Sequence, residues 1–192
     1  MEVSRKSDKT SEQGVVSIEF VLVIFAILAT VFFVIEVTLY LFFSASVHKA
    51  AQSGARALAV SAPVVDSFPI ENERSANGVF GVDCADQTSP CIAFTQISCT
   101  GNACNSDFTR IFNHMSRFNG QILPQHVTVS YGPTGLGFAG GPTIPLVTVT
   151  VTGVPFRAGF TGLLLNSVGI IPTLPTHIVS TTGEDLSNGA AE

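Results

Sequence analysis

A carboxylate, Glu19, stands near the start of an apolar run that extends from Val15 to about Val47, in which the only other charged residue is Glu36. A charged side chain in the hydrocarbon core of a bilayer costs about 2.5–3.5 kcal/mol on insertion scales, and such residues usually face a partner or a polar cavity. The small residue Gly14 separates this run from a polar, charged leader, and a peptidase could cut there. The pattern therefore favours trimming, ion pairing and assembly rather than catalysis.

Four cysteines within a short window predict two disulfides in an oxidising compartment, because their number is even and the region is rich in loops. They are Cys84, Cys91, Cys99 and Cys104. Three pairings are possible, and the local one, Cys84–Cys91 with Cys99–Cys104, is favoured because it closes two short loops. Zinc is less favoured, since its knuckles usually separate cysteines by about 2–4 residues.

No combination of residues predicts an active site, a metal site or a cofactor. The four histidines are dispersed along the chain at His48, His114, His126 and His177. Residues 135–140 match G-x-G-x-x-G, but prolines follow at once where a dinucleotide site needs a helix, so a hairpin connection is expected. The net charge of −5, without an extended basic cluster, argues against nucleic acid as a partner.

A membrane-spanning helix is the first element needed to position Glu19. About 20 residues up to Ile35 match the roughly 30 Å hydrocarbon core, which leaves Glu36 near the outer interface. An ordinary secretory signal peptide would have a shorter apolar region, with its cleavage site after that region. An uncleaved signal anchor is the stronger alternative.

The helix is expected to continue to about residue 60, through an alanine-rich stretch that ends before Pro63. Its small residues allow close approach to another helix or close packing on its own domain, and both alternatives stay open. An unbroken helix over 15–60 would be about 69 Å long.

A small α+β domain should follow. An amphipathic helix is predicted over 106–119, with an apolar stripe formed by Phe108, Ile111, Phe112, Met115 and Phe118. Strands of an antiparallel sheet are predicted at 126–131, 146–152 and 177–182, with shorter candidates at 79–82 and 91–97.

These elements divide the chain into a leader (1–14), a transmembrane helix that continues as a stem (15–62) and a disulfide-containing domain (63–192). Lys and Arg residues set membrane orientation. Arg5, Lys6 and Lys9 favour a cytoplasmic N-terminus, although Lys49 and Arg56 follow the span on the other side. The domain is therefore expected in the periplasm.

The stretch from Gly14 to Val60 resembles the TadE-like pseudopilins (TadE and TadF) of the tight-adherence, or Flp, type IV pilus machinery. The resemblance rests on Gly14, on Glu19-Phe20 after four further residues, on the second acid Glu36 and on the Gly-Ala-Arg sequence at 54–56. It implies cleavage after Gly14 by a prepilin peptidase, a mature chain that begins at Val15, and a structural role at the bacterial inner membrane. Other pilins and the assembly platform would be partners, and the chain would stay at the base of the pilus or enter the filament.

Cleavage would expose an α-ammonium group at Val15, four residues and one helical turn from Glu19. The ammonium group of the same chain or of a neighbour could then neutralise this carboxylate, which reduces the penalty for burying it. The competing interpretation is an uncleaved, membrane-anchored periplasmic binding protein or adhesin. An anchored enzyme has little support.

Overall fold

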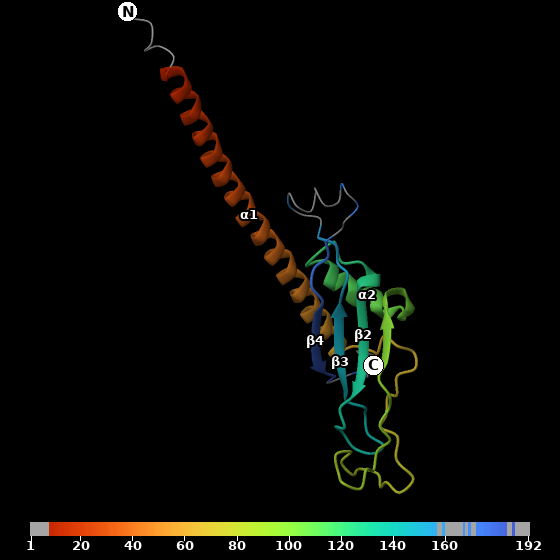
Figure 1. Cartoon of the computed structure of the whole chain (residues 1–192). Coiled ribbons are helices and arrows are strands. Elements are labelled where there is room, and N and C mark those ends of the chain that lie inside the picture. The colour runs from red at the N-terminus through yellow and green to blue at the C-terminus, as the bar shows by residue number, and fades with distance from the viewer. Residues whose placement is uncertain are drawn as a thin grey trace, which may run out of the picture. The chain divides into compact units, whose positions relative to one another are not determined.

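The computed structural model describes residues 8–156, 159, 167, 169, 172–183 and 186, with side chains from Ser17 onward (Figure 1). The chain forms two compact units. One contains Met1–Leu41 together with Arg157–Ile171, and the other contains Phe42–Phe156 together with Pro172–Glu192.

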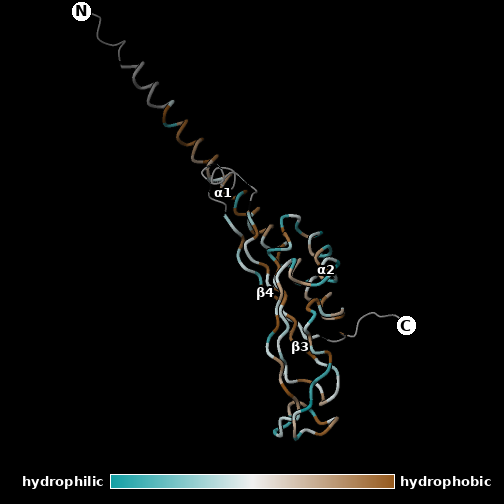
Figure 2. Tube along the Cα trace, turned by 90° about the vertical axis from the view of Figure 1, so that its right-hand side faces the viewer, coloured by the Kyte–Doolittle hydropathy of each residue, from teal (hydrophilic) through white to brown (hydrophobic). Residues whose placement is uncertain are grey.

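Helix α1 extends over 52 residues, Asp8–Ala59. Most of its large apolar side chains between Ile18 and Phe42 are exposed, for example Phe25 at 69%, and Figure 2 colours much of this part as hydrophobic. The stretch Ser17–Ala59 is long and apolar enough to cross a membrane, with a mean hydropathy of 2.9 in its most apolar window. The predicted long apolar helix is confirmed.

The helix begins earlier than expected. Residues 8–13, predicted to belong to a polar tail, are helical, as is the backbone of Gly14 and Val15. Polar residues without a proline continue a helix readily, and a single glycine costs only about 1 kcal/mol. Residues 1–7 of the expected leader lie outside the described residues.

The second unit is built on a four-stranded sheet in the order β1-β2-β3-β4, and all neighbouring strands are antiparallel. The strands are β1 (Ile97–Thr100), β2 (Val127–Pro133), β3 (Pro145–Val151) and β4 (His177–Thr182). Helix α2 (Asp107–Ser116) lies between β1 and β2 in the sequence. The α+β prediction is confirmed, and β4 has the predicted bounds.

One face of the sheet forms the domain core. The valines at alternate positions of β2 and β3 are fully buried, as is Tyr131. The last part of α1 and the apolar stripe of α2 supply further buried side chains, including Leu58 and Ile111, so these helices cover this face. Burying each such side chain contributes about 1.5–3 kcal/mol. The Val64 N–H donates to the Tyr131 hydroxyl over 3.2 Å, while burial raises the pKa of that hydroxyl.

The other face of the sheet is covered with hydroxyl groups. Thr128 pairs with Thr150 across β2 and β3, and the Thr100 and Thr128 hydroxyls bond to each other over 2.9 Å. The Thr148 and Ser180 hydroxyls make a similar 2.9 Å bond. This polar face explains the strict alternation of valine and threonine in β3.

Two of the strand predictions, those for 79–82 and 91–97, are wrong. Residues 79–82 form no strand, and over 91–97 only Ile97 belongs to one. The chain at or next to these segments instead makes isolated bridges, Arg74 with Cys91 and Asp83 with Phe138. The expected helix over 106–119 is also shorter, and Phe118 lies beyond its end with 49% exposure.

Candidate functional site

The assembly residues predicted in the N-terminal segment lie along one helix. Glu19 and Phe20 are both exposed on α1, with Phe20 at 64%. The side chain of Val15 lies outside the described residues. Any surface that recognises Glu19 must therefore come from another molecule or from a part of the chain beyond the described residues.

Threonine hydroxyl groups within the apolar stretch donate hydrogen bonds to backbone carbonyls of their own helix. The Thr30 hydroxyl donates to the Ala26 carbonyl over 2.8 Å, and the Thr38 hydroxyl donates to the Val34 carbonyl over 2.8 Å. Such bonds to the preceding turn leave no exposed donor for an apolar environment to penalise. Glu19 therefore differs in kind from these polar residues, because a carboxylate cannot donate to a carbonyl of its own helix.

The second acid, Glu36, lies 17 positions beyond Glu19, which is about 25 Å along a helix. Within one chain, the two carboxylates therefore cannot form one site. Glu36 is half-buried, and its carboxylate lies against Gly159, where an added Cβ would stand 2.5 Å from Oε1. Gly159 also has a φ of +86°, a conformation that glycine adopts most easily. The sequence carried no signal for this contact.

The alanine-rich end of α1 packs on its own domain, which decides between the two alternatives left open by the sequence. Ala50 and Ala51 are fully buried, and Ala55 is 1% exposed. A Cβ added to Gly54 would stand 2.6 Å from the Met115 Sδ of α2. The small residues therefore allow α1 to approach α2 closely.

A polar contact secures the same packing. The Asn119 side chain, which is 6% exposed, donates from Nδ2 to the Ser46 Oγ of α1 over 2.9 Å. Its Oδ1 accepts the Gln121 N–H over 2.9 Å. A buried amide with partners for both its donor and its acceptor holds α1 against the segment that follows α2.

Both predicted disulfides are present. Cys84 is bonded to Cys91, and Cys99 is bonded to Cys104, which is the local pairing favoured by the sequence. Within the described parts of the chain, no group of three or more His, Cys, Asp or Glu residues could hold a metal ion.

Two of the four histidines, expected to be dispersed, come together. The rings of His48 on α1 and His177 on β4 have centroids 5.6 Å apart. The Ser44 hydroxyl lies 3.3 Å from His177 Nε2, and Gln52 Nε2 lies 2.9 Å from His48 Nε2. Burial, and then the nearby His48, lower the pKa of His177. Only the fold reveals this pair, because 129 positions separate the residues.

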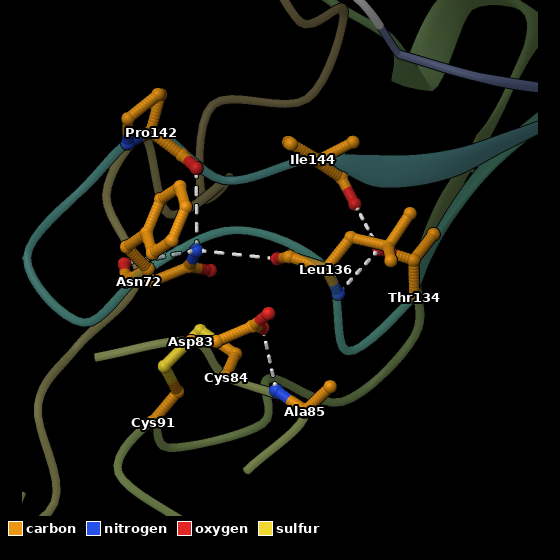
Figure 3. Close-up of a disulfide and its surroundings, with 10 residues drawn as sticks. Asn72, Asp83, Cys84, Ala85, Cys91, Thr134, Leu136, Pro142 and Ile144 are labelled. Carbon is orange, nitrogen blue, oxygen red and sulfur yellow. Dashed lines mark hydrogen bonds between the residues drawn. A yellow bond between two sulfur atoms is a disulfide. The ribbon is translucent and has the colours of Figure 1, made fainter. Parts of the chain in front are cut away.

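The glycine-rich segment 135–140 connects β2 to β3, as expected for a hairpin connection (Figure 3). The Asn72 side chain points into this connection, and its Nδ2 lies 3.4 Å from the Leu136 carbonyl and 3.2 Å from the Pro142 carbonyl. A Cβ added to Gly137 would stand 2.6 Å from the same nitrogen. The glycines therefore allow close approach of Asn72 to the backbone of this connection.

Residues 14–56 match the model of the TadE-like protein family. This match confirms the resemblance over the segment that contains Glu19, Glu36 and Gly54. The family is one of structural, pilin-like proteins associated with Tad pilus machinery, and the match covers 43 of the 192 residues. No curated protein and no solved structure matches the chain.

Proposed function

We propose that this chain is a minor pilin or pseudopilin that supports assembly of a tight-adherence (Flp) type IV pilus at the bacterial inner membrane. The observation that carries the proposal is the TadE-like segment at 14–56, which includes the part of α1 between Ile18 and Phe42 where most large apolar side chains are exposed. A surface of this kind suits lipid or the apolar helices of other pilins. The protein would act structurally, without catalysis.

The chain would cross the membrane once, with its N-terminus in the cytoplasm and its domain in the periplasm. Arg5, Lys6 and Lys9 support this orientation through the positive-inside rule. The two disulfides support it independently, since such bonds persist in the oxidising periplasm and are rare in the cytoplasm.

A prepilin peptidase would cleave after Gly14, so that the mature chain begins at Val15. The new α-ammonium group, with a reference pKa of about 8, would be largely charged at neutral pH. It would pair with the exposed Glu19 carboxylate of its own or a neighbouring chain. Because an unpaired buried charge is costly, this pairing would select the axial stagger of packed helices, with Phe20 alongside in the apolar contact. Near the periplasmic end of the span, Glu36 would contribute a second polar contact.

Intact mass measurement of the protein purified from its native membrane tests the processing step. The expected mass lacks residues 1–14, and N-terminal sequencing should begin at Val15. An intact N-terminus would overturn the proposal and favour an uncleaved, membrane-anchored binding protein or adhesin. As a control, the same chain produced without a prepilin peptidase should keep its leader.

A further inference from the structure

The domain carries a group of loops, here called the loop lobe, formed by residues 66–96 and 134–144. Figure 1 shows these loops gathered beyond one end of the sheet. Large apolar side chains are unusually exposed here: Ile70, Val79, Phe80, Ile92, Leu136 and Phe138 are between 48% and 70% exposed. Figure 2 shows hydrophobic residues among polar ones in the same loops. Clusters of exposed apolar residues on a soluble domain commonly mark interaction surfaces.

The loop lobe is an ordered structure with its own backbone hydrogen bonds. The Asn72 N–H donates to the Gly141 carbonyl over 2.8 Å, and the Ile92 N–H donates to the Glu73 carbonyl over 2.7 Å. The disulfide Cys84–Cys91 closes the outer loop. The segment 71–74 is therefore held on both sides, as a preformed binding surface requires.

A hollow of about 190 Å³ lies in the loop lobe. Its apolar walls include Ile92, Phe94 and Ile97, and its polar lining includes Glu71, Glu73 and Thr143. Sites for drug-sized ligands and cofactors have volumes of about 300–1,000 Å³, so this hollow suits a single side chain.

The net negative charge of the loop lobe favours the binding of a cation. Its acidic residues are Asp66, Glu71, Glu73, Asp83 and Asp86, and its single basic residue is Arg74. The Arg74 guanidinium lies 5.0 Å from the centre of the Phe80 ring and donates to the Gly78 carbonyl over 3.0 Å. It therefore already has contacts of its own within the lobe.

Glu71 and Glu73 are two positions apart in an extended segment, so their side chains lie on the same side of the backbone. Both are exposed, and both line the hollow. Within the described residues, neither carboxylate takes part in an ion pair. The chain thus presents two adjacent negative charges beside apolar walls.

An unsatisfied hydroxyl group is the independent sign of a ligand. Thr143 is 7% exposed, and its Oγ1 is buried without a hydrogen-bond partner among the described residues. Leaving a buried polar group unpaired is costly, so such a group needs an explanation. Thr143 lines this hollow and also the smaller one beside it.

We propose that this hollow binds a lysine or arginine side chain from a partner polypeptide, with apolar residues of the partner packing on Ile92 and its exposed neighbours. The aliphatic stem of the basic side chain would lie against Ile92 and Phe94, and its charged end would meet Glu71 and Glu73. The buried Thr143 hydroxyl would turn toward the same charged end. Long basic side chains combine an apolar stem with a charged head in this way. The inference concerns the domain alone and does not depend on the role proposed for the N-terminal helix.

Methyl NMR of the full chain in detergent micelles tests this proposal. The probes are the acetylated, amidated peptides Gly-Ile-Lys-Ile-Gly and Gly-Ile-Arg-Ile-Gly, with norleucine in place of the basic residue as the matched control. The Ile92 methyl signals should shift saturably with the lysine and arginine peptides below about 10 mM, a weak affinity expected for one side chain. The norleucine peptide should bind at least about tenfold more weakly, and the Ile178 methyl on β4 should not shift.

Variants separate a charge effect from a folding effect. Glu71→Gln and Glu73→Gln should each weaken binding about three- to fivefold, as expected for a partly exposed ion pair. Asp86→Asn makes the same charge change within the lobe but outside the hollow, and should leave binding unchanged. Thr143→Val should raise the melting temperature of the free protein, because it removes an unsatisfied hydroxyl, while it weakens binding of the peptide.

The following results would overturn the proposal: equal binding of the norleucine peptide, unchanged binding in both glutamine variants, or no saturable shift of Ile92. Calcium chloride is added alone in a separate titration. A saturable Ile92 shift with calcium, without one for the peptides, would make the hollow a metal site instead. Binding that requires a second copy, seen as an Ile92 shift with protein concentration alone, would also contradict a distinct partner.

Discussion

Gly54 of α1 lies directly against Met115 of α2, so close that any side chain at position 54 would overlap the Met115 sulfur. Both residues belong to the domain core, where Met115 is fully buried. Gly54 begins the Gly-Ala-Arg sequence, which lies within the family match at 14–56. The structure therefore gives this part of the family pattern a packing role within the domain.

Replacing Gly54 with leucine should destabilise the domain by about 1–3 kcal/mol, because the extra methylenes overpack a filled core. Thermal unfolding of the full chain in micelles, followed by near-UV circular dichroism, measures the change. The double variant Gly54→Leu/Met115→Ala should recover part of the loss, since neighbouring residues couple. Ala45→Leu is the control, because Ala45 is exposed on the same helix and should change stability by less than about 0.5 kcal/mol.

Glu19→Gln should abolish copurification with pilus components while leaving the protein in the membrane fraction. Glutamine keeps the shape of the side chain but removes the charge that would pair with the new α-ammonium group. Glu19→Asp keeps the charge and should retain a measurable part of the association. Copurification of Glu19→Gln at the wild-type level would contradict the ion-pair hypothesis.

Domain stability should fall as the pH drops below about 6.5, the ordinary pKa of histidine. Burial lowers the pKa of His126, whose Nδ1 accepts the Leu123 N–H over 3.1 Å. The unfolded chain therefore binds a proton at a higher pH than the folded chain, so this contribution to stability is complete above 6.5 and decreases as the pH falls toward the lowered pKa. His177, whose pKa is also lowered, should act in the same direction.

Melting temperatures measured between pH 7.5 and 5 check this pH dependence. His126→Asn should reduce the slope, because it removes one of the titrating groups. His114→Asn is the control, since His114 is exposed on α2 and should leave the slope unchanged. An equal slope in the wild type and in His126→Asn would contradict the assignment.

The two disulfides should differ in what they stabilise. Each closes a short loop, for which chain entropy predicts about 2–3 kcal/mol. Cys99 lies on β1 and is buried, so replacing both Cys99 and Cys104 with serine should lower the melting temperature of the whole domain. Replacing both Cys84 and Cys91 should mainly accelerate hydrogen exchange in the loop lobe, at amides such as that of Ala139, and should leave the Val149 amide protected. Uniform loss of protection in the second variant would contradict this division.

Sequence periodicity predicted those elements that are long and strongly patterned. The alternating strand at 146–152 and the strand at 177–182 match β3 and β4 to within one residue, because a half-buried sheet imposes a period of two. The local cysteine pairing was also predicted correctly, since short loops need little help from the fold. Hydropathy predicted the apolar helix, though not its start at Asp8.

The loop lobe could not be predicted in the same way. Its residues meet through single bridges and through the amide of Asn72, which contacts carbonyls more than 60 positions away. Such contacts leave no period in the sequence. The hollow beside Glu71 and the pair formed by His48 and His177 depend on the same long-range folding, so neither could be recognised from spacing.

The family match ends at residue 56, whereas the buried part of α1 begins at Val47. The matched segment thus contains two kinds of residue on one helix. Exposed apolar residues suit surroundings outside the domain, and small buried residues pack against the domain. A shortened chain that ended soon after this segment would expose Ala50, Ala51 and Leu58 to water. Such a fragment should therefore aggregate or be degraded, even though the exposed apolar part of its helix would be intact.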